Sequence, residues 1–449
     1  MLSCTVHGAL NGTVSAPVSK SDLHRLIIAC ALSCGESLIH RYTLSQDIQA
    51  TANVIGALGA SVRFENDCTI VDGIFPSTES AQSEILCDCN ESGSTLRFLV
   101  PVCAALGCRA VFTGHGRLSQ RPMEPLCSQL AAHGVSLQLP ENGDSLPLHI
   151  SGKLRGGDFF FSGDISSQYI TGLLFALPLL EEDSRILLTS PLQSKGYVEM
   201  TLQLLKQFGI RILPLENGWQ VFGRQNYCPP KQLTAQGDWS NAAFWLCAGA
   251  ISKTSASIRV TGMDMDSLQG DREVCQILQR MGAKMNIASD FIEVFPSQLH
   301  GTTIDAAQIP DIIPILSVAA AAAQGQTTIV NAGRLRIKES DRLHAICHNL
   351  TTLGAQVTEG TDSLVVCGTG SLNGGTVDSF NDHRISMSMA VASLLCEQPV
   401  TILDPMCVNK SYPDFFEQFE RFRRQRPFFR LSCIIYKEVY PCHRPGAAT

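Results

Sequence analysis

The chain has 449 residues, of which 45% are hydrophobic and 17% charged, and its formal net charge is −7. Its length is too great for one ordinary hydrophobic core, so two domains are predicted. A general nucleic-acid binder is disfavoured, because it would need a basic face with aromatic side chains nearby, and only 7% of the residues are aromatic. A membrane protein is disfavoured too, because the longest apolar stretches fall far short of the roughly 20 residues that span a bilayer.

The first residues, Met1–Leu10, show no basic segment followed by an apolar core, so we expect no signal peptide. The 18 cysteines are scattered along the chain and lack the paired C-x2-C spacing of a zinc site. We therefore expect reduced thiols in a cytoplasmic protein, with no metal and no cofactor.

Several apolar helical runs follow a residue that commonly caps a helix N-terminus, because its side chain accepts hydrogen bonds from free backbone N–H groups. In chain order these candidate caps are Ser19 or Ser21, Ser94 or Thr95, Ser166 or Ser167, Asp311, Ser340 or Asp341, Asn381 or Asp382, and Ser411. The last of them precedes a helix predicted over Pro413–Arg424. Taken singly, none of these residues needs a role beyond capping.

A second pattern recurs at nearly constant spacing: the end of an apolar helix, then a glycine, then the start of a strand. It occurs at Gly59, Gly134, Gly209, Gly282 and Gly354, at intervals of 72 to 75 residues. Glycine suits the position after a helix where the backbone turns left-handed. Five such sites predict a repeated unit of roughly 70–75 residues. A sixth unit would end near residue 425, where Arg423 stands in place of the glycine.

Six units in two domains give three units per domain, and each unit is long enough for two helices and about four strands. Mixed α/β is therefore the predicted class. The polar segment Gly223–Lys231, which contains two adjacent prolines, is predicted to link the two halves. The stretch Arg426–Thr449 fits no repeat and is expected to be a divergent, disordered tail.

Capping does not explain the cations that lie close to these helix starts. A helix N-terminus carries partial positive charge, so a lysine or arginine there is unfavourable by roughly 0.3–1 kcal/mol at an exposed site. Recurrence over five helices calls for a compensating anion, and free N–H groups beside lysine and arginine suit a ligand with several negative charges. The cations are Lys20, Arg25, Arg97, Lys338, Arg342, Arg384 and Lys410.

Three acid–base candidates lie among these cations. Glu339, in RIKESDR, follows a lysine just before a helix, where the surrounding charge can tune its pKa for proton transfer. His383 stands between a capping aspartate and an arginine, and Asp311 follows a proline. Arg121, in LSQRPMEPL, is a further candidate for the anion site. An alternative remains open for each residue: a solvated turn for Glu339, a structural role for His383, plain capping for Asp311, and an exposed surface position for Arg121.

Several common catalytic motifs are absent. The sequence contains no G-x-x-x-x-G-K-[ST], no G-x-G-x-x-G after a strand, no H-E-x-x-H and no G-x-S-x-G. These motifs would indicate nucleotide loops, dinucleotide sites, zinc proteases and nucleophilic serines. Acid–base chemistry combined with anion binding is therefore favoured over redox or metal chemistry.

Ten short segments, in order over about residues 5–420, resemble the 5-enolpyruvylshikimate-3-phosphate synthase family, also called the 3-phosphoshikimate 1-carboxyvinyltransferases. The segments are SAPVSKSDLHR, ESGSTLR, QRPM, SSQY, SKGY, GDWSNAA, IPD, RIKESDR, NDHR and NKSYPDFF. RIKESDR together with SKS-x3-R is highly specific, whereas each other segment is weaker alone.

The resemblance implies a two-domain inside-out α/β barrel, with three β-α-β-α-β-β repeats per domain and the active site in the interdomain cleft. It implies an N-terminal domain over residues 17–230 and a C-terminal domain over residues 231–425. The first strand, within residues 1–16, would pack in the C-terminal domain. Helix N-termini face the cleft in this fold, which closes on substrate, so the cations would meet there.

The resemblance also implies a reaction. The family moves the enolpyruvyl group of phosphoenolpyruvate onto the 5-hydroxyl of shikimate 3-phosphate, in aromatic amino acid (chorismate) biosynthesis. Phosphate leaves after a tetrahedral intermediate. Each substrate carries a phosphate and a carboxylate, which is the kind of anion that the cations predict.

Site residues follow from the same resemblance. Shikimate 3-phosphate would contact Lys20, Ser21, Arg25, Ser166, Ser167, Gln168, Ser194, Tyr197, Asp311 and Lys338. Phosphoenolpyruvate would contact Lys20, Gly93, Arg121, Gln168, Arg342, Arg384 and Lys410. Asp311 would deprotonate the 5-hydroxyl, Glu339 would protonate the methylene carbon, and Lys20 or His383 would help the phosphate leave. These small molecules are the expected partners, with no nucleic acid or membrane, and the protein is expected to be a monomer.

Three features depart from the family pattern. Glu91 replaces a frequent asparagine next to Gly93, which puts a carboxylate near the phosphoenolpyruvate site. Arg334 replaces a frequent asparagine before Lys338, and the tail after about Arg424 has no family counterpart. We expect Glu91 to alter the affinity for phosphoenolpyruvate and for glyphosate-like inhibitors.

Two other functions remain open. The UDP-N-acetylglucosamine enolpyruvyl transferases resemble this fold and share the reaction type, but the loop cysteine expected in such a protein is absent from Arg117–Met123, where Arg121 stands. The second alternative is a catalytically inactive anion-binding scaffold. A scaffold would not need Asp311, Glu339 and His383 together with all the cations.

Overall fold

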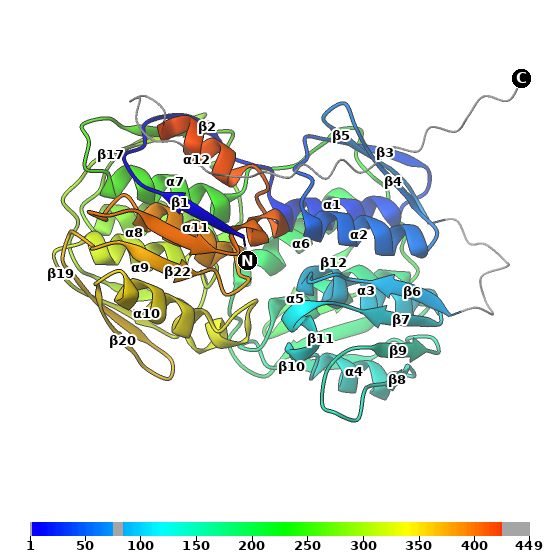
Figure 1. Ribbon diagram of the computed structural model, residues 1–449. Helices are drawn as coiled ribbons and strands as arrows, with labels where there is room; N and C mark the ends of the chain where they lie inside the picture. The colour runs from blue at the N-terminus through cyan, green and yellow to red at the C-terminus, as the bar shows by residue number, and fades with distance from the viewer. Residues whose placement is uncertain (1, 75–83, 424–449) are drawn as a thin grey trace, which may run out of the picture.

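The computed structural model describes residues 2–74 and 84–423 (Figure 1). Within these residues helices alternate with strands, and the strands form six small sheets. The class is therefore mixed α/β, as predicted. No helix among these residues is long and apolar enough to cross a membrane. The predicted tail, Arg426–Thr449, lies outside the described residues.

Three of the sheets are built from residues of the first half of the chain, one of them joined by the short strand β14 from the second half. Their strand orders are β14 (Leu233–Thr234), β3 (Glu36–His40), β5 (Cys68–Asp72), β4 (Ser61–Glu65); β6 (Ile85–Asp88), β7 (Ala110–Thr113), β9 (Leu148–Ser151), β8 (Ser136–Gln138); and β10 (Asp158–Phe161), β11 (Ser184–Leu188), β13 (Gly218–Val221), β12 (Ile212–Leu215). The helices that accompany them are α1 (Lys20–Ala31), α2 (Gln46–Ala57), α3 (Gly93–Leu106), α4 (Leu126–Ala132), α5 (Ser167–Ala176) and α6 (Lys195–Gln207).

The other three sheets combine the second half of the chain with the first two strands. Their orders are β16 (Lys284–Ile287), β17 (Phe291–Phe295), β15 (Ile258–Thr261), β2 (Gly12–Ser15); β18 (Thr303–Asp305), β19 (Gly325–Val330), β21 (Leu364–Gly368), β20 (Gln356–Glu359); and β1 (Ser3–Val6), β23 (Val400–Leu403), β22 (Gly375–Asp378). Their helices are α7 (Trp239–Ile251), α8 (Val274–Arg280), α9 (Ile313–Ala322), α10 (Arg342–Thr352), α11 (His383–Ala392) and α12 (Phe415–Arg423).

The sheets repeat one strand pattern. In five of the six described sheets, a parallel pair is extended by two antiparallel strands, as β10, β11, β13 and β12 illustrate. In the sixth sheet β22 and β23 form the parallel pair, and β1 from the start of the chain supplies the antiparallel partner. Strand β2 pairs in parallel with β15, and β14 pairs in parallel with β3. Each half of the chain therefore contributes a strand to a sheet of the other half.

The buried hydrophobic residues form two clusters. One draws its residues from 18–235, and the other from 4–16 together with 239–419. Figure 1 shows α1 to α6 on one side of the molecule and α7 to α12 on the other. The predicted linker Gly223–Lys231 is irregular, but Tyr227 within it is buried in the first cluster and donates to the carbonyl of Phe175 at 2.7 Å.

The repeated glycines were predicted correctly. Each of the five follows a helix end and has a left-handed φ between 78° and 103°. They are Gly59, Gly134, Gly209, Gly282 and Gly354. A side chain at this φ would be strained, which explains why the pattern recurs with the unit.

Most predicted helix caps are confirmed, and three are wrong. Ser19, Ser166, Asp341 and Asp382 cap their helices as predicted. Helix α3 is capped by Ser92, whose hydroxyl accepts from the backbone N–H of Thr95, and not by Ser94 or Thr95.

The two remaining cap predictions, at Asp311 and Ser411, are also wrong. Asp311 caps nothing: Ile312 precedes helix α9 without a side-chain cap, because the Asp311 carboxylate is bound by neighbouring cations. Ser411 ends the 3-10 helix η5 (Pro405–Lys410), and α12 starts only at Phe415. The helix predicted over Pro413–Arg424 thus begins two residues later, and Arg424 lies outside the described residues.

Candidate active site

Residues from both halves of the chain line one cavity that is open to solvent. Of the residues predicted for the site, all but Lys410 line it. They are Lys20, Ser21, Arg25, Gly93, Arg121, Ser166, Ser167, Gln168, Ser194, Tyr197, Asp311, Lys338, Glu339, Arg342, His383 and Arg384. Segments that are hundreds of residues apart in the sequence therefore meet around one space.

Helix N-termini deliver many of these residues. Lys20, Gly93, Ser167, Arg342 and His383 are the first residues of α1, α3, α5, α10 and α11, and all five line the cavity. Free N–H groups and the partial positive charge of a helix N-terminus both favour anions. The cavity is thus surrounded by positive helix ends before any side-chain charge is counted.

Side-chain charge strengthens this preference. Eight cationic side chains line the cavity against three carboxylates, among the residues that the structure describes. The cations are Lys20, Arg25, Arg97, Arg121, Arg334, Lys338, Arg342 and Arg384, and the carboxylates are Asp47, Asp311 and Glu339. Such an excess of buried positive charge requires a ligand with several negative charges.

Arg342 is the centre of the charge network. Its side chain is 1% exposed and binds three carboxylates, each at 2.8 Å: Asp311 through Nη1, Glu339 through Nη2 and Asp382 through Nε. Burial alone would lower the pKa of this guanidinium, but the three carboxylates, led by Asp382, raise it above its ordinary value. Arg342 is permanently charged, and it holds both acid–base candidates in place.

Asp311 is surrounded by donors. Lys338 Nζ lies 3.4 Å from Oδ1, and Arg384 Nη2 lies 3.7 Å from Oδ2. Burial works against an ionised Asp311, but the lysine and two arginines outweigh it and hold the pKa of this carboxyl well below its usual range. Burial in turn lowers the pKa of Lys338 to about 8, although Asp311 opposes that shift. Asp311 is therefore ionised and able to accept a proton.

Glu339 lies between two arginines. Its carboxylate is 3.3 Å from Arg121 and 2.8 Å from Arg342. Burial would raise the pKa of Glu339, yet the fields of these two arginines, with a smaller contribution from Lys338, hold it well below its usual range. Glu339 is therefore ionised, and its pKa would rise only if negative charge neutralised these arginines.

His383 and several arginine donors lack partners. Neither ring nitrogen of His383 has a hydrogen-bond partner within the described residues, and the same holds for Arg384 Nη1 and Arg121 Nε. Burial, reinforced by Lys20 and Arg384, holds the pKa of His383 well below its usual range, so its imidazole is neutral. Buried donors of this kind normally have an acceptor, and here they line the cavity where an oxyanion would lie.

The family model described as EPSP synthase (3-phosphoshikimate 1-carboxyvinyltransferase) matches residues 5–419. The chain belongs to the EPSP synthase family. A relative in Clostridium perfringens named 3-phosphoshikimate 1-carboxyvinyltransferase is 45% identical over 415 residues, which cover 92% of this chain and 96% of that protein. A relative of the same name in Clostridioides difficile is 44% identical over 422 residues, covering 92% and 95% of the two chains.

Solved structures agree with this membership. The EPSP synthase from Acinetobacter baumannii is 26% identical, with a TM-score of 0.77 over 94% of this chain and 98% of that one. The enolpyruvyl transferase NikO from Streptomyces tendae, at 18% identity and a TM-score of 0.75 over 93% and 96% of the chains, shares the fold.

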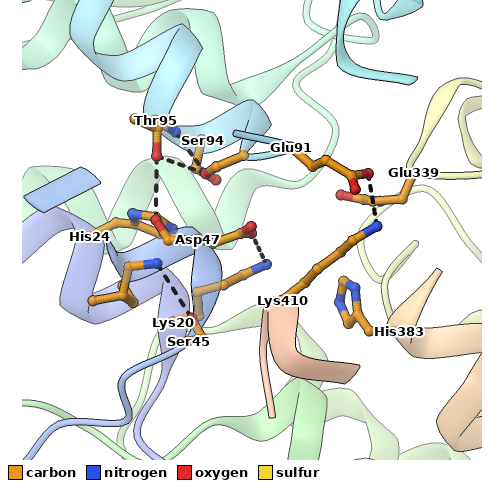
Figure 2. Close-up of polar contacts among 12 residues, drawn as sticks. Lys20, His24, Ser45, Asp47, Glu91, Ser94, Thr95, Glu339, His383 and Lys410 are labelled. Atoms are coloured by element: carbon orange, nitrogen blue, oxygen red, sulfur yellow. Dashed lines mark hydrogen bonds and ion pairs between the residues drawn. The ribbon is translucent and has the colours of Figure 1, made fainter. Parts of the chain in front are cut away.

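Lys410 is the one predicted site residue that does not line the cavity of this EPSP synthase family member. Its ammonium group donates to Glu91 Oε2 at 2.8 Å and to the carbonyl of Asn381 at 2.6 Å. The Glu91 carboxylate also accepts from the side-chain amide of Asn381, at 3.0 and 3.2 Å. Figure 2 shows Glu91 and Lys410 joined. Glu91, which departs from the family pattern, is thus paired with Lys410, a cation expected to bind phosphoenolpyruvate.

Sequence reasoning missed three site contacts. Asp47 binds Lys20 Nζ at 2.7 Å (Figure 2), and Arg334 donates to the hydroxyl of Ser194 at 3.1 Å. Arg97, one of the cations at the helix starts, donates to Gln168 Oε1 at 2.7 Å. The only signal for Asp47 was its place in the first turn of α2, after the capping Ser45. A carboxylate two residues after a cap is too common to indicate a site.

Gly93 has a steric reason to lack a side chain. A Cβ there would lie 2.7 Å from Arg121 Nη1 and 2.8 Å from Arg121 Cζ. The absence of a side chain therefore lets the Arg121 guanidinium lie flat against the start of α3, beside Glu339. Arg25, deeper in the site, is held by the carbonyls of Ser21 and Tyr197 at 2.6 and 2.9 Å.

Proposed function

We propose that this protein transfers the enolpyruvyl group of phosphoenolpyruvate to the 5-hydroxyl of shikimate 3-phosphate and releases phosphate, as a step of aromatic amino acid biosynthesis. The observation that carries the proposal is one cavity in which eight cations surround two acid–base carboxylates, Asp311 and Glu339. Both substrates carry a phosphate and a carboxylate, which match this charge. The names of the relatives support the same reaction.

Shikimate 3-phosphate is proposed to bind on the side of α1, α5 and α6. Lys20, Ser166, Ser167 and Ser194 would hold its phosphate, because hydroxyls, a lysine and the N-terminus of α5 converge there. Arg25 would bind its carboxylate. The remaining contacts of this substrate are assigned to Ser21, Gln168, Tyr197, Asp311 and Lys338.

Phosphoenolpyruvate is proposed to bind between the two carboxylates. Arg121, Arg342 and Arg384 supply bidentate donors for its phosphate and carboxylate. The backbone N–H of Gly93, at the start of α3, adds a donor. Lys20 and Gln168 complete the contacts, and Lys410 joins them once it leaves Glu91.

The chemistry then follows from the charges. Asp311 takes the proton of the 5-hydroxyl, the oxygen attacks C2 of phosphoenolpyruvate, and Glu339 gives a proton to C3, which forms the tetrahedral intermediate. The Glu339 carboxylate then takes a proton back from C3 as the C2–O bond to phosphate breaks and the C2–C3 double bond re-forms, and the leaving phosphate takes a proton from Lys20 or accepts a hydrogen bond from His383. Preorganised donors stabilise the charge that develops on the phosphate oxygens.

The domain arrangement is part of the proposal. We propose two inside-out α/β barrel domains of three β-α-β-α-β-β units each, over residues 17–230 and 231–425, with residues 1–16 in the second. The two hydrophobic clusters and the pairing of β1 and β2 with strands of the second half support it, and β14 from the start of the second domain pairs in turn with β3 of the first. We propose that the cleft closes on substrate and that the protein works as a cytoplasmic monomer.

Release of inorganic phosphate tests the function. Purified protein and phosphoenolpyruvate are mixed with shikimate 3-phosphate, with UDP-N-acetylglucosamine, or with no acceptor. We expect phosphate release only with shikimate 3-phosphate. Release with UDP-N-acetylglucosamine and not with shikimate 3-phosphate would assign the chain to the other enolpyruvyl transferases. No release with either acceptor would indicate a protein that binds anions without catalysing the transfer.

A further inference from the structure

We propose that Asp271 is a positioning residue for this reaction, which as a neutral acid turns the hydroxyl of Tyr197 toward Asp311. The inference rests on the proposed function, because it concerns the carboxylate assigned to deprotonate the 5-hydroxyl. Asp271 lies on the 3-10 helix η3 (Gly270–Glu273), is 0% exposed and lies outside the cavity lining. It acts through Tyr197 and touches no substrate.

Tyr197 stands between two carboxylates. Its hydroxyl oxygen lies 3.1 Å from Asp271 Oδ2 and 3.3 Å from Asp311 Oδ2. A phenol carries one hydrogen, so it donates to one of these oxygens at a time. An ionised Asp271 competes for that hydrogen. A protonated Asp271 instead donates to the phenol oxygen, and this leaves the phenol hydrogen for Asp311.

The surroundings of Asp271 favour the protonated form. No lysine or arginine of the described residues forms an ion pair with it: Oδ2 meets two hydroxyls, one of them from Ser240, and Oδ1 has no partner in that part of the chain. Burial, followed by the charge of Asp311 and to a lesser degree of Asp238, raises the pKa of Asp271 to about 7, although Arg384 and the Ser240 hydroxyl act in the opposite direction. The proton that decides the orientation of Tyr197 is therefore present below neutral pH.

Close backbone packing fixes the distance between Tyr197 and η3. Gly196 lies so near the loop before η3 that a Cβ there would be 2.5 Å from the carbonyl oxygen of Leu268 and 2.9 Å from the backbone nitrogen of Gly270. Helix α6 belongs to the first hydrophobic cluster and η3 is followed by α8 of the second. Tyr197 thus joins the two parts of the molecule at the proposed base.

The pH dependence of turnover tests the inference. Phosphate release is measured between about pH 5.5 and pH 9.5 for the unchanged protein and for Asp271→Asn, which cannot ionise. We expect the unchanged protein to lose turnover in a first step near pH 7, where Asp271 ionises, and in a second near pH 8, where Lys338 loses its proton. Asp271→Asn should keep turnover within about threefold at low pH and lose only the first step.

Two further variants distinguish a positioning role of Asp271 from a purely structural one. Tyr197→Phe should remove the first step as well, and in that background Asp271→Asn should cause no further change in the profile. Asp266→Asn, an exposed carboxylate of the preceding loop, should leave the profile unchanged.

Three results would overturn the proposal. They are a first step that persists in Asp271→Asn, a loss above about tenfold at every pH in an Asp271→Asn protein with normal thermal unfolding, and a first step that persists in Tyr197→Phe. The last result decides the matter if Asp271→Asn fails to fold. Absence of phosphate release from the unchanged protein would instead refute the proposed function.

Discussion

The ammonium group of Lys410 donates to the carboxylate of Glu91 at 2.8 Å, across 319 positions of sequence. Lys410 is nearly buried, with 5% of its side chain exposed, whereas Glu91 is 24% exposed. The pair therefore connects the segment before α3 with the end of η5. A substrate that needs Lys410 must first displace Glu91.

We predict that Glu91→Gln lowers the KM for phosphoenolpyruvate by about fivefold, because a neutral amide competes less for Lys410 than a carboxylate does. The value of kcat should change by less than about twofold. Steady-state kinetics at saturating shikimate 3-phosphate measures both. Glu84→Gln, which alters an exposed ion pair with Arg109, is the matched control. An unchanged or higher KM would mean that Glu91 does not compete with this substrate.

Glu339→Gln should bind both substrates and yet turn over about 10²-fold more slowly or worse, the usual scale for an acid–base group. The amide keeps a hydrogen-bond acceptor for Arg121 and Arg342 but has no proton to give. Isothermal titration measures binding, and phosphate release measures turnover. Turnover equal to that of the unchanged protein would remove Glu339 from the mechanism.

Gly93→Ala should raise the KM for phosphoenolpyruvate by about tenfold or more, because the new Cβ would displace the guanidinium of Arg121. Gly56→Ala is the matched control: Gly56 also lies in a helix, but a Cβ there meets nothing within 4 Å. That substitution should raise the free energy of unfolding by about 0.5–1 kcal/mol and leave KM unchanged. Equal kinetics for the two variants would contradict the steric role of Gly93.

Shikimate 3-phosphate alone should stabilise the fold, because it neutralises cations that face one another across the cavity. At a hundred times its Kd the free energy of unfolding should rise by about 2.7 kcal/mol. Urea unfolding with and without the ligand measures the gain, and added salt should reduce it. At the same concentration, unphosphorylated shikimate should stabilise the fold much less, because it lacks the phosphate. Equal stabilisation by both compounds would place the phosphate outside the proposed serine and lysine contacts.

Local sequence signals predicted local structure well. The five repeated glycines and the caps Ser19, Ser166, Asp341 and Asp382 depend on backbone geometry within one helix end, which a short segment determines. Ser92 was missed because three neighbouring hydroxyl residues compete for the cap of α3, and only the geometry selects one. Asp311 was misassigned as a cap because cations distant in sequence bind its carboxylate.

The convergence of the cations was predicted, whereas their pairing was not. A helix start with a lysine or arginine indicates an anion site whatever its neighbours, and six of the seven cations in this pattern line the cavity. Gln168, Ser194 and Tyr197 followed only from the family resemblance. The ion pairs of Lys20 with Asp47 and of Lys410 with Glu91 join separate segments. A single sequence contains no signal for such contacts, because they depend on how the helices pack in three dimensions.

The pairing of β1 with β23 constrains how the chain can fold as it is synthesised. Strand β1 leaves the ribosome long before its partner at Val400–Leu403. The sheet that contains both strands cannot form until Val400–Leu403 has emerged, and closing so long a loop is slow. Strands β1 and β2 must therefore wait unpaired while the intervening residues are synthesised, so chaperone dependence and aggregation during expression should originate in the sheets that these two strands complete.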